Sequence, residues 1–223
     1  MKALKRWLDR RGALPLTCYL AAALLWVVLG AVHWGSDALA RSGGTLYEAE
    51  IPVTDWQLAG LETGESTAET AVLTTTNGDP QMILEDVSDM VVRTLSYTVE
   101  FEGDAREMCL YYTTKVGEDY SQDRRVFPEA LGDGKYLYTL PRTSIVALRL
   151  DPCSPDENKT VEMTFTPGTI SLNKAETLPA VWQYFVPSWY QAFCLVLYPA
   201  LAAAACSWLR AVVRALRQRK KAP

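Results

Sequence analysis

The chain has 223 residues, of which 49% are hydrophobic, and a formal net charge of −4. That total hides a separation of charge. Residues 42–180 hold 24 acidic and 10 basic side chains, a net of −14, whereas nearly all the charge outside this range is basic. So acidic a region repels nucleic acid and anionic lipid, which excludes both as its partners. Its length is that of one domain.

Two uncharged apolar stretches flank this region. The first is LTCYLAAALLWVVLGAVHW, residues 16–34, and the second is WYQAFCLVLYPALAAAACSWL, residues 189–209. At about 1.5 Å per helical residue, each is long enough to cross a bilayer core of about 30 Å. Aromatic residues from Trp182 onward precede the second stretch, as at membrane interfaces. We therefore predict a transmembrane helix over 16–34, and an interfacial segment with a second transmembrane helix over 182–209.

The basic residues predict the orientation. Five lie in residues 1–15 and six in residues 210–223. The positive-inside rule makes these segments cytoplasmic tails, which predicts a two-pass protein of the cell membrane with its central domain outside the cytoplasm. The triplet Ala38-Leu39-Ala40 matches a leader-peptide cleavage pattern, so a cleaved leader is an alternative. The long apolar run, followed by bulky His33 and Trp34, favours an uncleaved anchor.

Within residues 42–178, short runs with period-two alternation recur between turn signals such as Asn77-Gly78 and Asp151-Pro152. This pattern predicts an all-β antiparallel sandwich of jelly-roll type. The predicted strands are 46–53, 71–76, 81–84, 95–101, 108–114, 135–140, 145–150, 161–166 and 169–172. In the run over 145–150, alternation places Val146, Leu148 and Leu150 toward the core. Ala147, Arg149 and Asp151 should then lie on the other face.

A set of local motifs follows in order along the middle of the chain. They are Leu110-Tyr111-Tyr112, Gly117-Glu118-Asp119-Tyr120-Ser121, Leu140-Pro141 and Leu148-Arg149-Leu150-Asp151-Pro152. This order, from Glu85 to Asn173, resembles an extracytoplasmic β-sandwich module attached to bacterial multi-span glycosyltransferases and other cell-surface polysaccharide membrane proteins. That module favours Gly after Asp-Pro, where this chain has Cys153. The sequence lacks the multi-span catalytic portion, so the resemblance implies a scaffold or glycan-contacting role.

Sugar binding on a sandwich would use aromatic rings that stack on sugar faces, with polar side chains beside them. The candidate ligand-binding residues are Trp56, Tyr111, Tyr120, Tyr136 and Tyr138, with Arg124 and Arg149 as polar partners. The alternative is that these tyrosines are packing residues, as most strand tyrosines are.

The only histidine, His33, lies at the end of the first apolar stretch. The outer domain therefore cannot assemble a Ser-His-Asp or Cys-His site or a histidine zinc site. No pair of acids is singled out by spacing, so we predict no catalytic residue and no cofactor. Two acidic clusters offer oxygen ligands for Ca²⁺ as an alternative. They are Glu85, Asp86 and Asp89, and Asp151, Asp156 and Glu157.

Three of the five cysteines, Cys18, Cys194 and Cys206, lie in the apolar stretches, where thiols pack as small apolar groups. Cys109 and Cys153 lie in the outer domain. An extracytoplasmic compartment permits a disulfide between them, and the alternative is two free thiols.

These observations predict a non-catalytic, two-span membrane protein with an accessory or glycan-binding role in cell-surface polysaccharide assembly in a bacterial envelope. Its partners would be the lipid bilayer and either a glycan or a membrane glycosyltransferase. One alternative is a purely structural subunit of a larger membrane complex, because Ala200 and residues 202–205 suit close helix packing. Another is a carboxylate-dependent enzyme that acts on glycosides.

Overall fold

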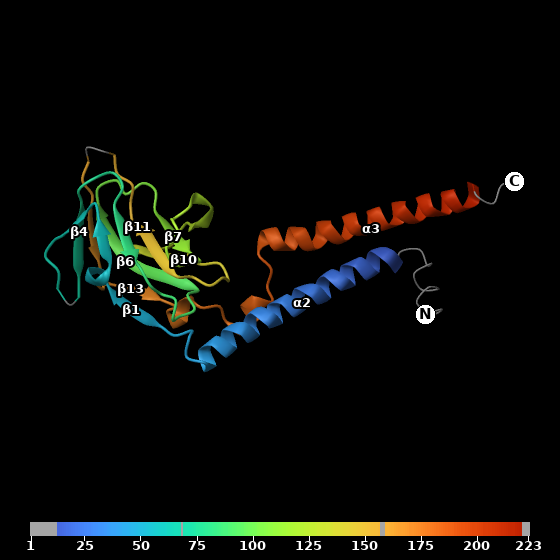
Figure 1. Ribbon diagram of the computed structural model, residues 1–223, viewed down its shortest axis with the longest axis horizontal. Helices are drawn as coiled ribbons and strands as arrows, with labels where there is room; N and C mark the ends of the chain where they lie inside the picture. Colours follow the sequence, from blue (N-terminus) through green and yellow to red (C-terminus); the bar gives the residue numbers. More distant parts are fainter. Residues whose placement is uncertain (1–12, 68, 157–158, 220–223) are drawn as a thin grey trace. The chain divides into compact units, whose positions relative to one another are not determined.

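The computed structural model describes residues 13–67, 69–156 and 159–219 (Figure 1). The chain divides into two compact units. One is Asp37–Leu178, and the other combines the segments Met1–Ser36 and Pro179–Pro223. Most of the predicted first tail, the end of the second tail and Glu157 of the second acidic cluster lie outside the described residues.

The helical unit contains most of α2 (Ala13–Ser42), the short 3-10 helix η4 (Val181–Tyr184) and α3 (Trp189–Arg219). The Tyr19 hydroxyl donates to the Val196 carbonyl at 3.0 Å, and the Trp26 indole donates to the Phe185 carbonyl at 2.8 Å. The earlier residue of α2, Tyr19, contacts the later partner, Val196, and the later residue, Trp26, contacts the earlier partner, Phe185. The helices α2 and α3 therefore run antiparallel. A Cβ at Gly30 would lie 2.8 Å from the Tyr184 carbonyl oxygen, so only glycine fits this close approach.

The surface of both long helices is apolar. Ala13–Ser42 and Ala175–Gln218 each hold an apolar window long enough to cross a membrane by length and composition, and only 6% and 11% of these windows is buried. Side chains such as Leu20, Leu24 and Val32 are more than half exposed. The prediction of two long apolar helices beside a sandwich is confirmed.

The unit Asp37–Leu178 contains the end of α2, short strands and three 3-10 turns. The strands are β1 (Ala49–Pro52), β2 (Gln57–Ala59), β3 (Leu61–Thr63), β4 (Ala71–Thr75), β5 (Gln81–Leu84), β6 (Thr94–Glu102), β7 (Cys109–Thr113), β8 (Arg125–Val126), β9 (Glu129–Gly132), β10 (Lys135–Thr139), β11 (Ala147–Asp151), β12 (Glu162–Phe165) and β13 (Thr169–Leu172). The turns are η1 (Val53–Asp55), η2 (Gln122–Arg124) and η3 (Ala175–Thr177).

These strands form two antiparallel sheets. The eight-stranded sheet has the order β1-β13-β6-β12-β4-β3, with β10 pairing β6 and β9 pairing β10. The five-stranded sheet has the order β2-β5-β11-β7-β8. The chain passes repeatedly from one sheet to the other, from β4 to β5 to β6 to β7. The prediction of an antiparallel β-sandwich is confirmed.

The core lies between the two sheets and is made of alternate residues from both. Leu148 and Leu150 of β11 are fully buried, as are Leu73 of β4 and Leu95 of β6. Removing such side chains from water stabilises the fold by roughly 1.5–3 kcal/mol each. The predicted alternation is correct within β11, because Ala147 and Arg149 are only partly buried. It is wrong for Val146, which precedes β11 and is only partly buried, while its neighbour Ile145 lies in the core.

Every predicted strand is present, with ends shifted by a few residues, but four short strands were missed. They are β2, β3, β8 and β9. Each has two to four residues and pairs on one side only, at a sheet edge. An edge strand packs few side chains into the core, so it carries little alternation in its sequence.

Candidate functional site

Two of the predicted ligand-binding aromatics, Trp56 and Tyr138, lie inside the sandwich, and a third, Tyr111, is covered on its outer face. Trp56, Tyr111 and Tyr138 are 3%, 5% and 0% exposed. The hydroxyl of Tyr138 is hydrogen-bonded to that of Tyr97 at 3.0 Å, and burial raises the pKa of both phenols. Their ring faces are covered by the protein itself, so in this structure they offer no platform for a sugar.

The structure brings Tyr111 together with two further predicted residues, Tyr120 and Arg149, on the outer face of the five-stranded sheet. Arg149 of β11 pairs with Tyr111 of β7 in the strand register. Its guanidinium carbon lies 4.3 Å from the centroid of the Tyr111 ring and 5.3 Å from that of Tyr120. The Tyr120 hydroxyl donates to the Leu148 carbonyl at 3.3 Å. Cation–π attraction holds the guanidinium between the rings, which occupies the faces that a sugar would need.

Beside this arginine lies Asp151, which is buried although it sits on the outer face. Arg149 Nη2 donates to Asp151 Oδ2 at 2.9 Å, and the Cys109 thiol lies 3.9 Å from the same oxygen. Burial raises the pKa of Asp151 to about 6, and the attraction of Arg149 offsets only part of that rise. Among the described residues, neither Asp151 Oδ1 nor Arg149 Nε has a hydrogen-bond partner. The side chains of Arg149, Asp151 and Cys109 contact one another and link β7 to β11.

The two remaining predicted residues lie apart from this cluster. Arg124 of η2 pairs with Glu118, whose carboxylate also accepts from the Thr114 backbone N–H at 3.0 Å. That backbone bond, with the arginine, lowers the pKa of Glu118. Tyr136 of β10 is half-buried, with its ring centroid 5.8 Å from that of Tyr97.

Cys109 and Cys153 are free thiols with different surroundings. Cys109 faces Asp151, whereas the sulfur of Cys153 lies 3.8 Å from that of Met163 in the core. Burial raises the pKa of the Cys153 thiol to about 12. The structure therefore agrees with the alternative of two free thiols.

Some carboxylates of the acidic clusters considered for Ca²⁺ are engaged by neighbouring side chains. Asp86 accepts hydrogen bonds from the N–H and hydroxyl of Ser88, which lower its pKa. Asp156 pairs with Arg106 and Lys159. Within residues 13–67, 69–156 and 159–219, no three His, Cys, Asp or Glu side chains come close enough to hold a metal ion.

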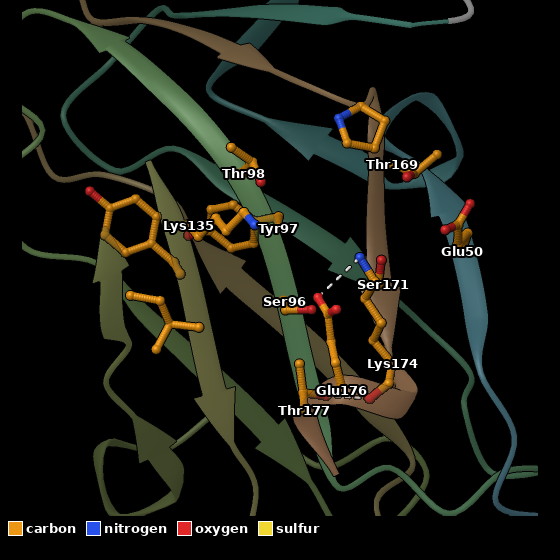
Figure 2. Close-up of a pocket in the computed structure, with 13 residues that line it drawn as sticks. Glu50, Ser96, Tyr97, Thr98, Lys135, Thr169, Ser171, Lys174, Glu176 and Thr177 are labelled. Carbon is orange, nitrogen blue, oxygen red and sulfur yellow. Dashed lines mark hydrogen bonds and ion pairs between the residues drawn. The ribbon is translucent and has the colours of Figure 1, made fainter. Parts of the chain in front are cut away.

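A separate depression lies on the outer face of the eight-stranded sheet (Figure 2). Its volume is about 70 Å³, room for roughly two waters. Short hydroxyl side chains line it, and charged side chains surround them (Figure 2). The hydroxyls are Ser96 and Thr98 of β6, Thr169 and Ser171 of β13, and Thr177 of η3; the charges are Glu50, Lys135, Lys174 and Glu176. Tyr97, Leu131, Tyr136 and Pro167 complete the lining, so one predicted ligand-binding residue, Tyr136, lies at this depression.

Strand register explains why these hydroxyls are neighbours. Ser171 of β13 pairs with Ser96 on one side and with Glu50 of β1 on the other. Lys135 of β10 pairs with Thr98. Paired residues in adjacent strands point to the same face, so this face combines side chains from four strands. We call this set of residues the hydroxyl pocket.

The turn beside the hydroxyl pocket, residues 173–177, is held in place by hydrogen bonds at both of its ends. Asn173 is 1% exposed, and its positive φ of 53° turns the chain away from β13. Its Oδ1 accepts from the Arg93 N–H at 2.7 Å, and its Nδ2 donates to the Val91 carbonyl at 2.7 Å. Thr177 is tied to Thr94 by a hydroxyl–hydroxyl bond of 2.7 Å. The backbone between Asn173 and Thr177 is therefore held at both ends.

The side chains on that turn form an exposed ion pair. Lys174 Nζ lies 3.3 Å from Glu176 Oε1, and the two side chains are 40% and 69% exposed. Figure 2 shows this pair beside Ser171 and Ser96. Exposed pairs of this kind contribute at most about 1 kcal/mol to stability. Hydroxyls donate and accept, while the carboxylates accept and the ammonium groups donate. Together they can hydrogen-bond a polyhydroxylated ligand.

Searches of protein-family models and of curated proteins return no match for this sequence. Solved structures do return similar chains. A low-affinity xylan-binding module from Roseburia intestinalis is 13% identical with a TM-score of 0.36, over 59% of this chain and 99% of its own. The C-terminal carbohydrate-binding module of a laminarinase from Zobellia galactanivorans is 9% identical with a TM-score of 0.38, over 57% and 100%. A family 29 carbohydrate-binding module is 6% identical with a TM-score of 0.40, over 60% and 94%. The strand pairing of this chain defines its sandwich independently of these likenesses.

Proposed function

We propose that this protein is a two-pass membrane protein that presents its β-sandwich outside the cell membrane and contacts glycan with the hydroxyl pocket, without catalysing a reaction. The observation that carries the proposal is the apolar surface of the two long helices. Leu20, Leu24, Leu25, Val28 and Val32 of α2 are 48–66% exposed. Water penalises such a surface by about 25 cal/mol for each Å² of apolar area, and a bilayer removes the penalty.

The antiparallel pairing of α2 and α3 supports the proposed topology. An antiparallel pair that crosses a bilayer has both outer ends on one side, where the basic flanks at residues 1–15 and 210–223 also lie in the sequence. The positive-inside rule assigns that side to the cytoplasm. The acidic sandwich is then extracytoplasmic.

The ligand class is supported by the chemistry of the hydroxyl pocket. Thr177 is already engaged and the Thr169 hydroxyl is buried, but the hydroxyls of Ser96, Thr98 and Ser171 can each donate to one sugar hydroxyl and accept from another. Catalysis lacks support, because the one histidine of the chain, His33, lies in α2 and cannot act as a base in the sandwich. The pair of Arg149 and Asp151 is already closed on itself.

A binding titration tests the ligand half. The full chain in detergent micelles is titrated with cellohexaose, xylohexaose and mannohexaose while the amide NMR signals of β6 and β13 are followed. We expect at least one hexasaccharide to shift these signals with millimolar affinity, and the variant Ser96→Val/Thr98→Val to lose the shifts. Gln57→Ala is the matched control, because Gln57 is an exposed polar residue of the other sheet. Absence of shifts with every hexasaccharide would rule out the ligand half.

Reporter fusions test the topology half. A cytoplasm-active reporter after Pro223 should be active, and a reporter inserted at Gly103, in the turn after β6, should be active only outside. An externally active reporter after Pro223 would overturn the two-pass arrangement.

A second candidate function is an assembly subunit that packs α3 against a larger membrane protein, such as a membrane glycosyltransferase. Ala202, Ala204 and Ala205 of α3 are exposed in this structure, and small residues let a further helix approach closely. Cysteine crosslinking from position 204 in intact membranes should trap a heterologous protein if this function holds. Trapping only copies of this chain would contradict it.

A further inference from the structure

The charges around the hydroxyl pocket carry no positive excess. Lys174 is held by Glu176, and Glu50 lies among the same lining residues. A further carboxylate, that of Glu48, accepts a hydrogen bond from the Ala175 N–H at 3.2 Å, on the same turn. With Lys135 as the second cation, these side chains carry three negative and two positive charges. Sites that bind carboxylates or phosphates need the opposite balance, usually with arginine forks.

The net charge of the whole domain also disfavours anionic ligands. Residues 42–180 carry a net charge of −14, so the sandwich repels polyanions at long range. At physiological salt this repulsion reaches about 8 Å, which is comparable to the width of a sugar chain on the surface. An anionic polysaccharide would meet repulsion both on approach and at the pocket.

The pocket is too small to enclose a sugar. Sites that bury a small molecule have volumes of about 300–1,000 Å³, whereas this depression has about 70 Å³. A ligand would therefore lie across the face of the sheet and contact the hydroxyls with one edge. The side chains at the rim, rather than a closed cavity, then determine which sugars are accepted.

We infer that the hydroxyl pocket accepts neutral glycan chains and rejects chains that bear uronic acids, and that Glu176 is the residue that sets this preference. This inference rests on the proposed function. Glu176 neutralises Lys174 and places its own negative charge at the rim, 69% exposed. Removing that charge leaves Lys174 available to a ligand carboxylate on the same fixed turn.

The test uses the full chain in nanodiscs of zwitterionic lipid. The probes are neutral hexasaccharides of glucose and of mannose, each compared with its C6-oxidised form, in which hydroxymethyl groups are replaced by carboxylates. We expect the wild-type chain to bind a neutral form and to show at least tenfold weaker binding to its oxidised form. Glu176→Gln should bind the oxidised form about fivefold more tightly than the wild type does in low salt, and 0.5 M NaCl should abolish that gain.

Glu62→Gln is the matched control. Glu62 is an exposed glutamate of β3 outside the pocket lining, so its replacement makes the same change in net charge elsewhere. Equal gains from Glu62→Gln and Glu176→Gln would overturn the role of Glu176. Equal binding of neutral and oxidised forms by the wild type would overturn the inference and leave the proposed function standing. Failure of every probe to bind the wild type would overturn the proposed function itself.

Discussion

Two aspartates in the unit Asp37–Leu178 are almost fully buried beside arginine, and their surroundings differ. Asp37, in the last turns of α2, is 1% exposed, and Asp151 of β11 is 8% exposed. Asp37 accepts hydrogen bonds from Arg93 Nε at 3.0 Å and from Arg142 Nη1 and Nη2 at 2.8 and 2.7 Å. Asp151 has one arginine, and its Oδ1 has no partner among the described residues.

The two aspartates differ in how far their hydrogen bonds compensate the cost of burying a carboxylate. A buried carboxylate loses hydration, and only charged hydrogen bonds of good geometry recover that loss. Arg142 forks onto both oxygens of Asp37 while Arg93 adds a second cation, so Asp37 ties the loop before β6 and the loop after β10 to the end of α2. At Asp151 the compensation is incomplete, and its raised pKa of about 6 reports the remaining cost. One aspartate stabilises the fold in its charged form, and the other does so in its neutral form.

The largest effect is expected for Asp37→Ala. The change leaves Arg93 and Arg142 without their carboxylate, with side chains that are 13% and 28% exposed. Breaking a buried pair by removing one partner costs about 3 kcal/mol or more. Hydrogen exchange of β6 and β10 amides in the full chain should report this loss. Ser36→Ala is the control, because Ser36 is the exposed neighbour whose hydroxyl bonds only within the helix in this structure. Equal protection in Asp37→Ala and wild type would show that the cluster contributes nothing.

The same contacts bear on the cleavage pattern at Ala38-Leu39-Ala40. These residues are helical, and the Ala40 carbonyl accepts from the Thr45 and Leu46 N–H groups at 2.9 and 3.1 Å. A cut after Ala40 would remove Asp37 from both arginines. We expect the chain purified from membranes by a C-terminal tag to retain residues 1–40 in its intact mass. A mature N-terminus at Arg41 would contradict this.

A smaller effect, with a defined pH dependence, is expected for Asp151→Asn. Well below pH 3.8, the ordinary pKa of aspartate, Asp151 is protonated in both the folded and unfolded chains. As pH rises toward 6 the unfolded chain releases this proton first, so the stability that neutral Asp151 contributes is lost through the folded pKa of about 6. An asparagine keeps the neutral form. The free energy of unfolding of the variant minus that of the wild type should therefore rise by about 2 kcal/mol between pH 4 and 7.5.

Hydrogen exchange of β7 and β11 amides at several pH values measures that difference. Taking the difference cancels carboxylates with lowered pKa values, such as Asp86 and Glu118, which act in the opposite direction. Asp104→Asn makes the same replacement at an exposed acid and is the matched control. A flat difference for Asp151→Asn would show that Asp151 is as well compensated as Asp37.

Sequence patterning predicted the long strands and the alternation in β11, because a strand with one buried face records that burial at every second residue. It could not predict the cluster at Asp37. The partners of Asp37 lie 56 and 105 residues away, and a lone acid in an apolar helix carries no sign of them. Alternation placed Asp151 on the outer face correctly, but it could not show that Tyr111, Arg149 and Cys109 cover it there.

The candidate site was predicted less well, for a related reason. Aromatic residue type alone selected Trp56 and Tyr138, which the structure buries. Of the residues that line the hydroxyl pocket, the sequence selected only Tyr136. The hydroxyls were missed, although Ser96 with Thr98 and Thr169 with Ser171 have period-two spacing. What makes these hydroxyls a group is the pairing of β13 with β6, and the order of strands in a sheet is not written in local sequence.

The smallest effect is expected for Cys109→Ala, which tests whether the thiol acts as a second partner for Asp151. The sulfur lies 3.9 Å from Asp151 Oδ2, and a thiol is a weak donor, so it compensates the carboxylate far less than either arginine of Asp37 does. Loss of the sulfur should lower the free energy of unfolding by about 1 kcal/mol through packing alone. The pH dependence of that free energy should stay as in the wild type. Cys153→Ala is the matched control, because its sulfur contacts Met163 and no carboxylate in the described structure. Suppose instead that Cys109→Ala steepened the pH dependence while Cys153→Ala left it unchanged. The thiol would then be a true hydrogen-bond partner, and the carboxylate of Asp151 would be better compensated than its single arginine indicates.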